Sequence, residues 1–353
     1  MDIGIVTFHR ANNYGAVLQA YALLTSVNKF KDCNVKIIDY KRVVEDKRYS
    51  PLFNLDKICK VPLFNVSRCL KFELFRLKYL PLTSKANSLL EFESQISQFD
   101  IGIWGSDQVW NKNIYDIKDE DVFFGKGIEI KKIAYAPSMG SCQIEKFNDN
   151  VNDLKSFHFI TARDRTTSDN IKNLIKRDVS IVPDPVFLLS PTEWQRLFKR
   201  KKLFGEYIFY YQVGDDNSYG IAKKAAEQMK VPLVVVSSVC RYKDDLVKNV
   251  VGCGPIDLLQ LIYNAKCVYT NSFHGAAFSI IFSKEFYCIN LEKKGGNDRK
   301  TYLLKEFGLE DRMIKGRSIY HKNCGVIDYK EVREIYKKKR SYGLSKLKQM
   351  LYI

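Results

Sequence analysis

Short apolar runs alternate with helical spacings along the first half of the chain. The first run, residues 3–8, is followed by apolar positions 17, 18, 21 and 24, which lie on one face of a helix over residues 16–27. A second apolar run at residues 35–39 completes a strand–helix–strand unit, which predicts a parallel pair with a right-handed crossover. Further strands are predicted at residues 99–104, 131–136, 157–160 and 180–182, and a helix at residues 168–175.

The second half of the chain repeats this alternation. Strands are predicted at residues 207–212, 233–237, 267–269 and 286–290, and helices at residues 218–229, 255–264, 275–282 and 298–307. Strands that alternate with helices in both halves predict an α/β protein with two doubly wound, Rossmann-like domains that face a cleft.

Prolines mark the borders of the predicted domains. Pro51, Pro62 and Pro81 divide residues 41–95 into short pieces, which we interpret as a helical insertion in the first domain. The Pro-Asp-Pro segment at residues 183–185 predicts a rigid extended link, because each proline restrains itself and the residue before it. We therefore predict an N-terminal domain over residues 1–185, a C-terminal domain over residues 186–316 and a basic helical tail over residues 317–353.

The composition is typical of a soluble globular protein and predicts a cytoplasmic location. Hydrophobic residues make up 46% of the chain and charged residues 27%, and no run approaches the roughly 18 apolar residues of a membrane span. The chain begins with a strand-like run and shows no signal-peptide pattern. Its nine cysteines are an odd number without a C-x-x-C pair, so neither a disulfide framework nor a zinc knuckle is predicted.

The formal net charge is +17, and lysines cluster at residues 199–202 and 330–348. Two interpretations of these clusters stay open. They are either solvated helix faces or surfaces that dock on anionic lipid headgroups at the inner face of the plasma membrane. No RNP, zinc-finger or recognition-helix pattern occurs, so nucleic acid is not an expected partner.

His274 stands between a predicted strand and a predicted helix, in the run TNSFHGAAFS at residues 270–279. Backbone N–H groups and the helix dipole make such a junction a site for anions. A histidine there can deliver a proton near neutral pH. The other histidines, at positions 9, 158 and 321, provide no pair at i, i+3 or i, i+4, so no metal site is predicted. His274 is either a packed structural residue or a general acid.

Four loops that follow predicted strands carry polar residues, at residues 12–15, 105–111, 163–168 and 270–275. Ligands bind beyond the carboxyl ends of the strands in doubly wound sheets, so we expect these loops to share one cleft. Asparagine and glycine also suit tight turns, so turn formation is the structural alternative for residues 12–15.

Five motifs occur in order along the chain: NYGAVLQAYA at residues 13–22, GSDQVW at 105–110, Arg163 with Ser168 ahead of a helix, DPVF at 184–187 and SFHGAA at 272–277. Together with NDRKTYLL at 297–304 and FGLEDR at 307–312, they resemble the polysaccharide pyruvyl transferase family over roughly residues 1–315. The resemblance implies the two-domain architecture of B-type glycosyltransferases. It also implies transfer of an enolpyruvate-derived group from phosphoenolpyruvate, as co-substrate, to sugar hydroxyls; no cofactor and no metal are expected.

The resemblance implies roles for individual residues. His274 matches the family's histidine, which is thought to act as general acid, and Arg163 matches an arginine that follows the fourth strand. Members commonly carry an arginine where this chain has Ser272, and a serine cannot form a bidentate pair with an anion. The predicted donor site comprises Arg163, Ser272, Gly275, Ala276 and Arg299, and the predicted acceptor or phosphate loop comprises Asn12, Asn13, Tyr14, Gly15, Ser106 and Gln108.

Two charged residues have structural alternatives. Asp107 is either the base for an acceptor hydroxyl or the N-cap of the next segment. Arg163 either binds the donor or pairs with Asp164 or Asp184.

The sequence therefore predicts a pyruvyl transferase that modifies a sugar during surface polysaccharide biosynthesis, such as exopolysaccharide or capsule formation. If the acceptor is a lipid-linked oligosaccharide, the basic tail would hold the enzyme at the membrane. One alternative is a glycosyltransferase that uses a nucleotide sugar. The other is a non-catalytic protein that binds a glycan or an anion.

Overall fold

The computed structural model describes residues 1–41, 63–199, 204–213, 218–236, 244–290, 297–314 and 326–352. The chain divides into two compact units. Unit 1 comprises Met1–Lys60, Glu73–Leu189 and Lys339–Ile353, and unit 2 comprises Val61–Phe72 and Ser190–Lys338. The main passage from unit 1 to unit 2 thus lies at residues 189–190, just after the border predicted at residue 185.

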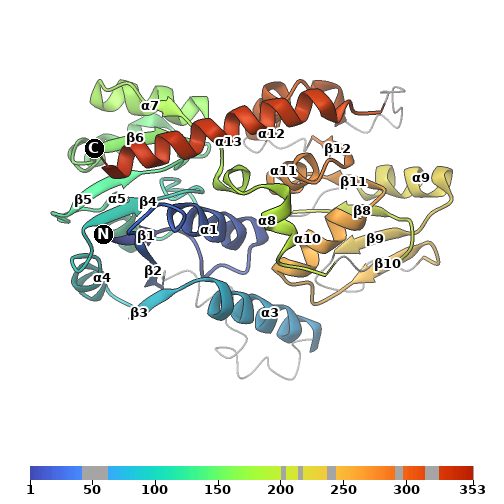
Figure 1. Cartoon of the computed structure of the whole chain (residues 1–353), viewed down its shortest axis with the longest axis horizontal. Coiled ribbons are helices and arrows are strands. Elements are labelled where there is room, and N and C mark those ends of the chain that lie inside the picture. Colours follow the sequence, from blue (N-terminus) through green and yellow to red (C-terminus); the bar gives the residue numbers. More distant parts are fainter. Residues whose placement is uncertain are drawn as a thin grey trace. The chain divides into compact units, whose positions relative to one another are not determined.

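Unit 1 contains a sheet of seven parallel strands (Figure 1). The strands lie in the order β3-β2-β1-β4-β5-β6-β7, so the order reverses between β1 and β4. Their bounds are β1 (Asp2–Val6), β2 (Asn34–Tyr40), β3 (Leu82–Ala86), β4 (Ile101–Trp104), β5 (Lys131–Ala134), β6 (Phe159–Ala162) and β7 (Ser180–Ile181).

Helices follow most of these strands, and polar caps fix where two of them begin. The helical segments are α1 (Tyr14–Val27), α4 (Leu89–Ile96), η2 (Ile117–Asp119), α5 (Glu120–Phe124), η3 (Ile144–Asn150), α6 (Val151–Lys155), α7 (Arg165–Ile175) and η4 (Pro185–Leu188). Asn13 starts α1 by accepting a hydrogen bond from the N–H of Gly15, and Asp164 starts α7 by accepting one from Thr167. Such caps satisfy N–H groups that have no partner inside the helix.

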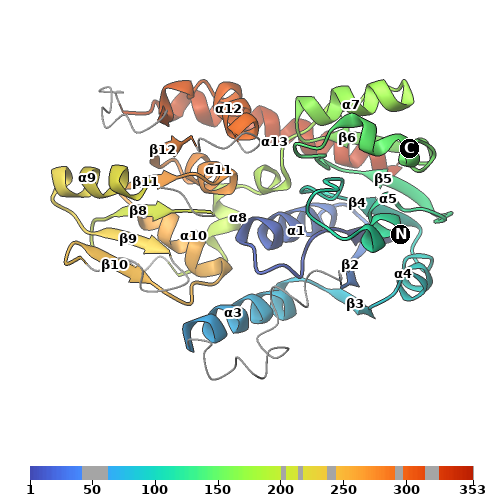
Figure 2. The ribbon, with the colours of Figure 1, turned by 180° about the vertical axis from the view of Figure 1, so that it is seen from behind.

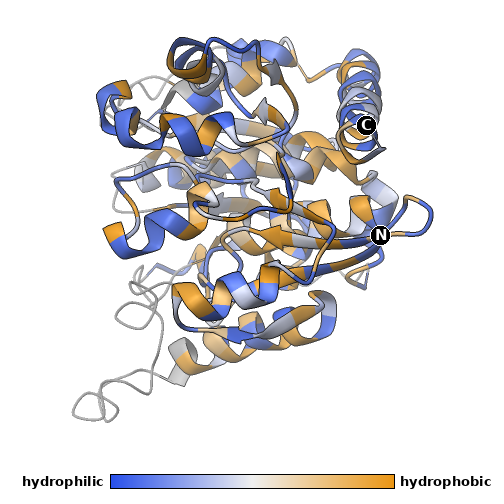
Figure 3. Cartoon of the chain, turned by 90° about the vertical axis from the view of Figure 1, so that its left-hand side faces the viewer, coloured by the Kyte–Doolittle hydropathy of each residue, from blue (hydrophilic) through white to orange (hydrophobic). Residues whose placement is uncertain are grey.

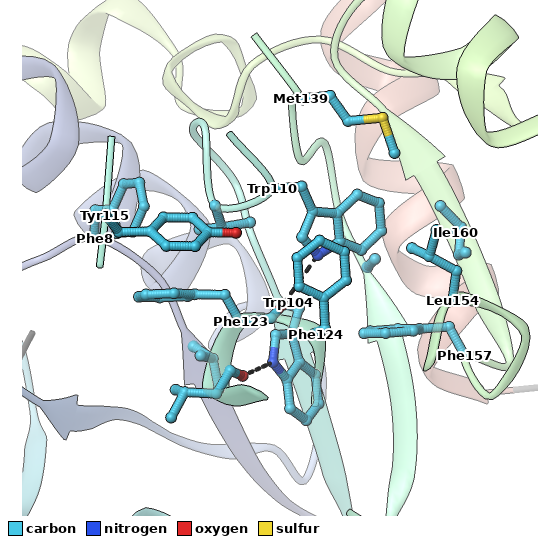
Figure 4. Packing of buried hydrophobic residues seen from close by; sticks show 14 of the residues in the cluster. Phe8, Trp104, Trp110, Tyr115, Phe123, Phe124, Met139, Leu154, Phe157 and Ile160 are labelled. Atoms are coloured by element: carbon cyan, nitrogen blue, oxygen red, sulfur yellow. Dashed lines mark hydrogen bonds between the residues drawn. The ribbon is translucent and has the colours of Figure 1, made fainter. Parts of the chain in front are cut away.

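Two apolar clusters cover the two faces of the sheet, because successive side chains of a strand point to opposite faces. Ile101 and Ile103 belong to one cluster and Trp104 to the other. In the cluster that contains Trp104, the rings of Trp104 and Trp110 both contact Phe157 edge-on. The centroid of Phe157 lies 5.4 Å from that of Trp104 and 5.7 Å from that of Trp110 (Figure 4). Both indole N–H groups donate to backbone carbonyls, which allows these large side chains to be fully buried.

Unit 2 contains a sheet of six parallel strands in the order β10-β9-β8-β11-β12-β13. Figure 2 shows β12, β11, β8, β9 and β10 in this order. The strands are β8 (Ile208–Tyr211), β9 (Leu233–Val236), β10 (Val247–Val250), β11 (Cys267–Thr270), β12 (Glu285–Ile289) and β13 (Met313–Ile314). The helical segments are α8 (Pro191–Gln195), α9 (Tyr219–Met229), α10 (Pro255–Asn264), α11 (Phe273–Ile281), α12 (Asn297–Glu306) and η5 (Glu310–Arg312).

Two helices have residues in both units. Helix α3 (Leu63–Tyr79) belongs to unit 2 up to Phe72 and to unit 1 from Glu73. Helix α13 (Tyr329–Tyr352) belongs to unit 2 up to Lys338 and to unit 1 afterwards.

The end of α13 is part of the core of unit 1. Leu347, Met350 and Leu351 are buried in the apolar cluster that contains β1, and a Cβ on Gly343 would come within 2.7 Å of the Leu188 side chain. Hydrophilic and hydrophobic residues alternate along this helix, which leads to the C-terminus in Figure 3. Leu347 and Leu351, which stand among the lysines, are therefore core residues, whereas Tyr342 is exposed. Burial of these leucines favours the interpretation of the tail as a solvated basic helix face, and docking on a membrane stays a prediction.

The predicted helical insertion over residues 41–95 is wrong in part. Residues 82–86 form β3, which pairs with β2 and completes one edge of the sheet. The carbonyl of Pro81 also accepts a hydrogen bond from Ile37 of β2. The strand was missed because its sequence, LTSKA, is short and polar, as edge strands often are. Residues 42–62 lie outside the described residues, as do residues 200–202 of the first lysine cluster and residues 317–325 of the predicted tail.

The prediction of two doubly wound α/β sheets is confirmed. Most predicted strands and helices agree with the structure to within a few residues, and α10 begins and ends where the sequence predicts. The expectation that the two domains face one cleft stays a prediction. Within the described ranges, no helix is both long enough and apolar enough to cross a lipid bilayer.

Candidate functional site

The strand order of unit 2 reverses between β8 and β11, and ligands bind at such a switch point in doubly wound sheets. Thr270, at the end of β11, donates its hydroxyl to the carbonyl of Tyr211, at the end of β8, at 2.7 Å. Asn271 exchanges two hydrogen bonds with the backbone of Val213, at 2.7 and 3.0 Å. These bonds fix the loop after β8 to the segment that leads to His274.

His274 lies in the first turn of α11, at the strand–helix junction that the sequence predicts. The preceding cap is made by Ser272, whose hydroxyl accepts from the N–H of Gly275 at 3.3 Å. Gly275 is needed there because a Cβ would lie 2.4 Å from the Thr270 hydroxyl oxygen. The imidazole of His274 is half-buried and meets the ring of Phe273 edge-on, with centroids 5.1 Å apart. Its side chain is therefore not used to cap the helix.

The backbone groups predicted to hold the donor are already engaged within α11. The N–H of Gly275 donates to the Ser272 hydroxyl, and the N–H of Ala276 donates to the Ser272 carbonyl at 3.1 Å. Both residues are buried. A donor anion beside His274 would therefore require charged or polar groups in addition to these two.

Tyr211 joins this site and was not among the residues predicted from the sequence. Its buried phenol is hydrogen-bonded to the Ser272 side chain. Burial raises the pKa of Tyr211, and this effect outweighs the Ser272 hydrogen bond and the nearby Arg68 charge, which lower it. The phenol therefore stays neutral. A tyrosine at the end of an apolar strand gives no distinct signal in the sequence.

The switch point of unit 1 lies between β1 and β4, and its predicted loop residues serve the structure. Ser106 is buried and donates its hydroxyl to the carbonyl of Ala136 at 2.9 Å. The Gln108 side-chain oxygen accepts from the amide of Asn111. These contacts hold the loop after β4 in place.

The loop after β1 is also tied to its surroundings. Asn12 is buried, and its side-chain oxygen accepts from the Arg76 guanidinium at 3.2 Å. Asn13 caps α1, and Tyr14 and Gly15 are buried in its first turn. Structural roles in the loop and in the start of α1 thus account for these contacts. A role of residues 12–15 in binding a ligand stays a prediction.

Arg163 lies in a buried network of ion pairs. The sequence left such pairing open as the alternative to a role of Arg163 in binding the donor. Its guanidinium is 2.9 Å from the Asp184 carboxylate, which is fully buried, and 3.4 Å from that of Asp107. Burial lowers the pKa of Arg163, but the charges of Asp184, Asp107 and Asp164 outweigh it and leave the pKa raised. Two carboxylates therefore already balance this cation, which weighs against its predicted role in binding a donor anion.

Asp107 does not act as the simple N-cap that the sequence offered as an alternative. Its backbone is left-handed, with a φ of 66°, and its carboxylate faces Arg163. Its carbonyl accepts from the N–H of Ser138 at 2.9 Å. The carboxylate thus belongs to the Arg163 network, and its role as a base stays a prediction.

A second ion-pair network lies at the carboxyl ends of β1 and β2. Asp39 accepts from the His9 ring at 2.8 Å and from Nε and Nη2 of Arg10, one edge of its guanidinium. The other His9 ring nitrogen faces the Thr7 carbonyl at 3.1 Å. Burial raises the pKa of Asp39, but the hydrogen bonds and charges of His9 and Arg10 outweigh it and lower the pKa to about 2.

The remaining predicted donor residue, Arg299, is half-buried in α12 of unit 2. The next residue, Lys300, is buried and donates to the Ile289 carbonyl at 2.7 Å, at the end of β12. Among the residues that the structure describes, no three histidine, cysteine or acidic side chains gather in a way that would hold a metal. Of the predicted site, His274, Ser272, Gly275, Ala276 and Arg299 thus belong to unit 2, and Asp107 and Arg163 to unit 1.

Solved structures of sugar-nucleotide enzymes share the fold. The structure of UDP-GlcNAc 2-epimerase from Methanocaldococcus jannaschii is 10% identical, has a TM-score of 0.56 and covers 100% of both chains. UDP-GlcNAc 2-epimerase from Neisseria meningitidis, bound to UDP-GlcNAc, is 11% identical, with a TM-score of 0.55 and 99% of both chains covered. At these identities the likeness shows the fold alone, which is the two-domain fold of the B-type glycosyltransferase class.

The family is shown by sequence. The family model described as polysaccharide pyruvyl transferase matches residues 13–292, which is most of the chain. The chain therefore belongs to the polysaccharide pyruvyl transferase family, a family of transferases that modify polysaccharides. No curated protein sequence matches the chain.

Proposed function

We propose that the protein transfers a pyruvyl group from phosphoenolpyruvate to two hydroxyls of one sugar, with His274 as the general acid. The family supports this reaction class. The observation that carries the role of His274 is its place at the switch point of unit 2, in the first turn of a helix whose cap is made by Ser272.

The proposed reaction begins with protonation of the donor's methylene carbon by the imidazolium of His274. The methylene becomes a methyl group, and the neighbouring carbon becomes oxocarbenium-like. The first sugar hydroxyl attacks this carbon, and the C–O bond to phosphate then breaks with its electron pair on phosphate. The second hydroxyl attacks the same carbon and closes the ketal. Of the two hydroxyl protons released, one restores His274 and the other leaves with phosphate, so atoms and charges balance.

The site chemistry suits general acid catalysis. A positioned general acid contributes about 10²–10⁴-fold to a rate. The N-terminal end of α11 also carries positive partial charge, which favours an anionic donor over a neutral one. Phosphoenolpyruvate is made inside cells, so the proposal assigns the reaction to the cytoplasmic side, on a free or lipid-linked sugar acceptor.

A donor comparison tests the proposal. The purified protein is incubated with a panel of sugar and lipid-linked oligosaccharide acceptors, once with phosphoenolpyruvate and once with nucleotide sugars. We expect phosphate release and a product heavier by one pyruvyl ketal. Release of nucleoside diphosphate instead would make the protein a glycosyltransferase. Binding of glycan without turnover of either donor would make it a non-catalytic binding protein.

A further inference from the structure

Thr270 is a fully buried residue whose hydroxyl links two strand ends of unit 2. It is the last residue of β11 and lies opposite Tyr211, the last residue of β8. Its hydroxyl donates to the Tyr211 carbonyl at 2.7 Å and accepts from the N–H of Ser272 at 3.0 Å. Backbone groups on either side of the residue thus use the hydroxyl both as a donor and as an acceptor.

This hydroxyl fixes the start of the turn that carries His274. The pairing of β11 with β8 ends at Thr270, so the N–H of Ser272 lies beyond the ladder. Its bond to Thr270 is what ties it to the end of the sheet. The Ser272 hydroxyl in turn accepts from the N–H of Gly275 and caps α11, in which His274 is the second residue. Two hydroxyls therefore connect the end of β8 with the first turn of the helix.

The Thr270 side chain also packs closely against Gly275, the residue that follows His274. A Cβ on Gly275 would lie 2.4 Å from the Thr270 hydroxyl oxygen and 3.0 Å from two of its side-chain carbons. In a close-packed interior such a side chain has little room to move. Thr270 thus restrains the backbone before His274 by a hydrogen bond and the backbone after it by packing.

We propose that Thr270 is a positioning residue for His274, which holds the imidazole where it protonates the donor. Thr270 is buried and acts only through the turn. The catalytic consequence rests on the proposed function, whereas the effect on the turn does not depend on the donor. A displacement of about 1 Å can cost about 100-fold in rate, so loss of this restraint should lower kcat.

Steady-state kinetics on the full-length protein test the proposal with two variants. T270V keeps a side chain of similar shape but removes the hydroxyl, and T270S keeps the hydroxyl. We expect T270V to lower kcat for phosphate release from phosphoenolpyruvate by about 10- to 100-fold, with a smaller change in KM. T270S should restore most of the wild-type kcat.

The matched control is Y207F. Tyr207 is buried, directly precedes β8 and donates its hydroxyl to the Leu261 carbonyl at 2.8 Å. Y207F therefore loses a comparable hydrogen bond at the opposite end of the same strand, and we expect a wild-type kcat. A loss of kcat in Y207F as large as that in T270V would overturn the proposal, because any weakening of the sheet would then have the same effect.

The double variant T270V/H274Q separates positioning from a general loss of folded protein. If Thr270 acts through His274, T270V should lower kcat by little more once His274 is replaced. If T270V only reduced the folded fraction, the losses of the two single variants would multiply. Multiplied losses, or a wild-type kcat in T270V, would overturn the proposal.

Hydrogen exchange tests the turn without any substrate. The amide protons of residues 271–276, followed by mass spectrometry, should exchange about 10-fold faster in T270V than in wild type, T270S or Y207F. Unchanged exchange would overturn the proposal whatever the donor is. Faster exchange in a protein that does not consume phosphoenolpyruvate would overturn the proposed function and leave the role of Thr270 in the turn. If T270V does not fold, T270C replaces it, because a thiol is a weak donor and a weak acceptor.

Discussion

The two units share the strand order around the switch point, but they differ in whether the side chains at the strand ends form ion pairs with one another. In unit 1, Arg163 is matched by the carboxylates of Asp184 and Asp107, and Asp39 is matched by His9 and Arg10. In unit 2, the corresponding strand ends carry Tyr211 and the Ser272–His274 turn. The charged groups described at the strand ends of unit 1 are thus paired with one another, whereas the strand ends of unit 2 carry the proposed general acid.

The difference shows that position in a fold does not by itself identify a site. Both switch points lie where doubly wound sheets bind ligands. Removing one partner of a buried ion pair costs stability, because the other charge is left buried without compensation. Substitutions in unit 1 should therefore act on stability first, and substitutions in unit 2 on activity first.

The largest effect is expected at His274. H274Q keeps a side chain of similar size but removes the acid, so kcat for phosphate release from phosphoenolpyruvate should fall by about 10²–10⁴-fold. The melting temperature should not change, because Ser272 makes the helix cap. The matched control is H158Q, since His158 is exposed in unit 1. An unchanged kcat in H274Q would remove the distinction between the units.

The next largest effect is expected at Arg163. R163M leaves the buried Asp184 carboxylate unpaired and should lower the free energy of unfolding by about 3–5 kcal/mol, measured by urea denaturation. The double variant R163M/D184N removes both charges and should lose less than R163M alone. If R163M were as stable as wild type but unable to bind phosphoenolpyruvate, Arg163 would be a donor-binding residue as the sequence analysis predicted.

A similar stability effect with a distinct pH dependence is expected at Asp39. Its pKa is lowered to about 2 in the folded protein, against about 3.9 in an unfolded chain. The stabilisation is therefore complete above about pH 4 and is lost as the pH falls towards 2. D39N should cost about 3 kcal/mol at pH 7, and the difference from wild type should shrink in unfolding curves recorded between pH 4 and pH 2. A difference that does not vary over this range would contradict the ion-pair account.

The smallest effect is expected at Ser272. S272A removes the cap of α11 and should cost about 1 kcal/mol of stability, with a modest loss of kcat through the position of His274. S272T retains the hydroxyl and serves as the control. A loss of activity in S272A as large as that in H274Q would assign Ser272 a direct role in the reaction.

The periodicity of the chain predicted the fold more completely than the site. Buried strands such as β8 and β11 are continuous apolar runs, whereas β3 is polar because it lies at an edge. His274 could be found because it stands between a strand and a helix and carries a family motif. Tyr211 could not, because its place beside the Ser272–His274 turn arises from the pairing of β8 with β11, far apart in sequence.

The same limit applies to Arg163 and Asp107. Their types and positions suited a binding site, but only coordinates show that each faces the other's charge. The tail shows the converse case. Its apolar positions were visible in the sequence, but only the structure shows that Leu347 and Leu351 are buried in the core of unit 1.

Proton transfer to the donor tests the central claim most directly. The reaction is run in heavy water with phosphoenolpyruvate and an accepted sugar, and the product ketal is followed by mass spectrometry for wild type and H274Q. The account predicts one solvent deuteron in the product methyl group and a wild-type rate at least a hundredfold above that of H274Q, the lower bound for a positioned acid (about 10²-fold). Equal rates of labelled ketal formation by the two proteins would contradict it.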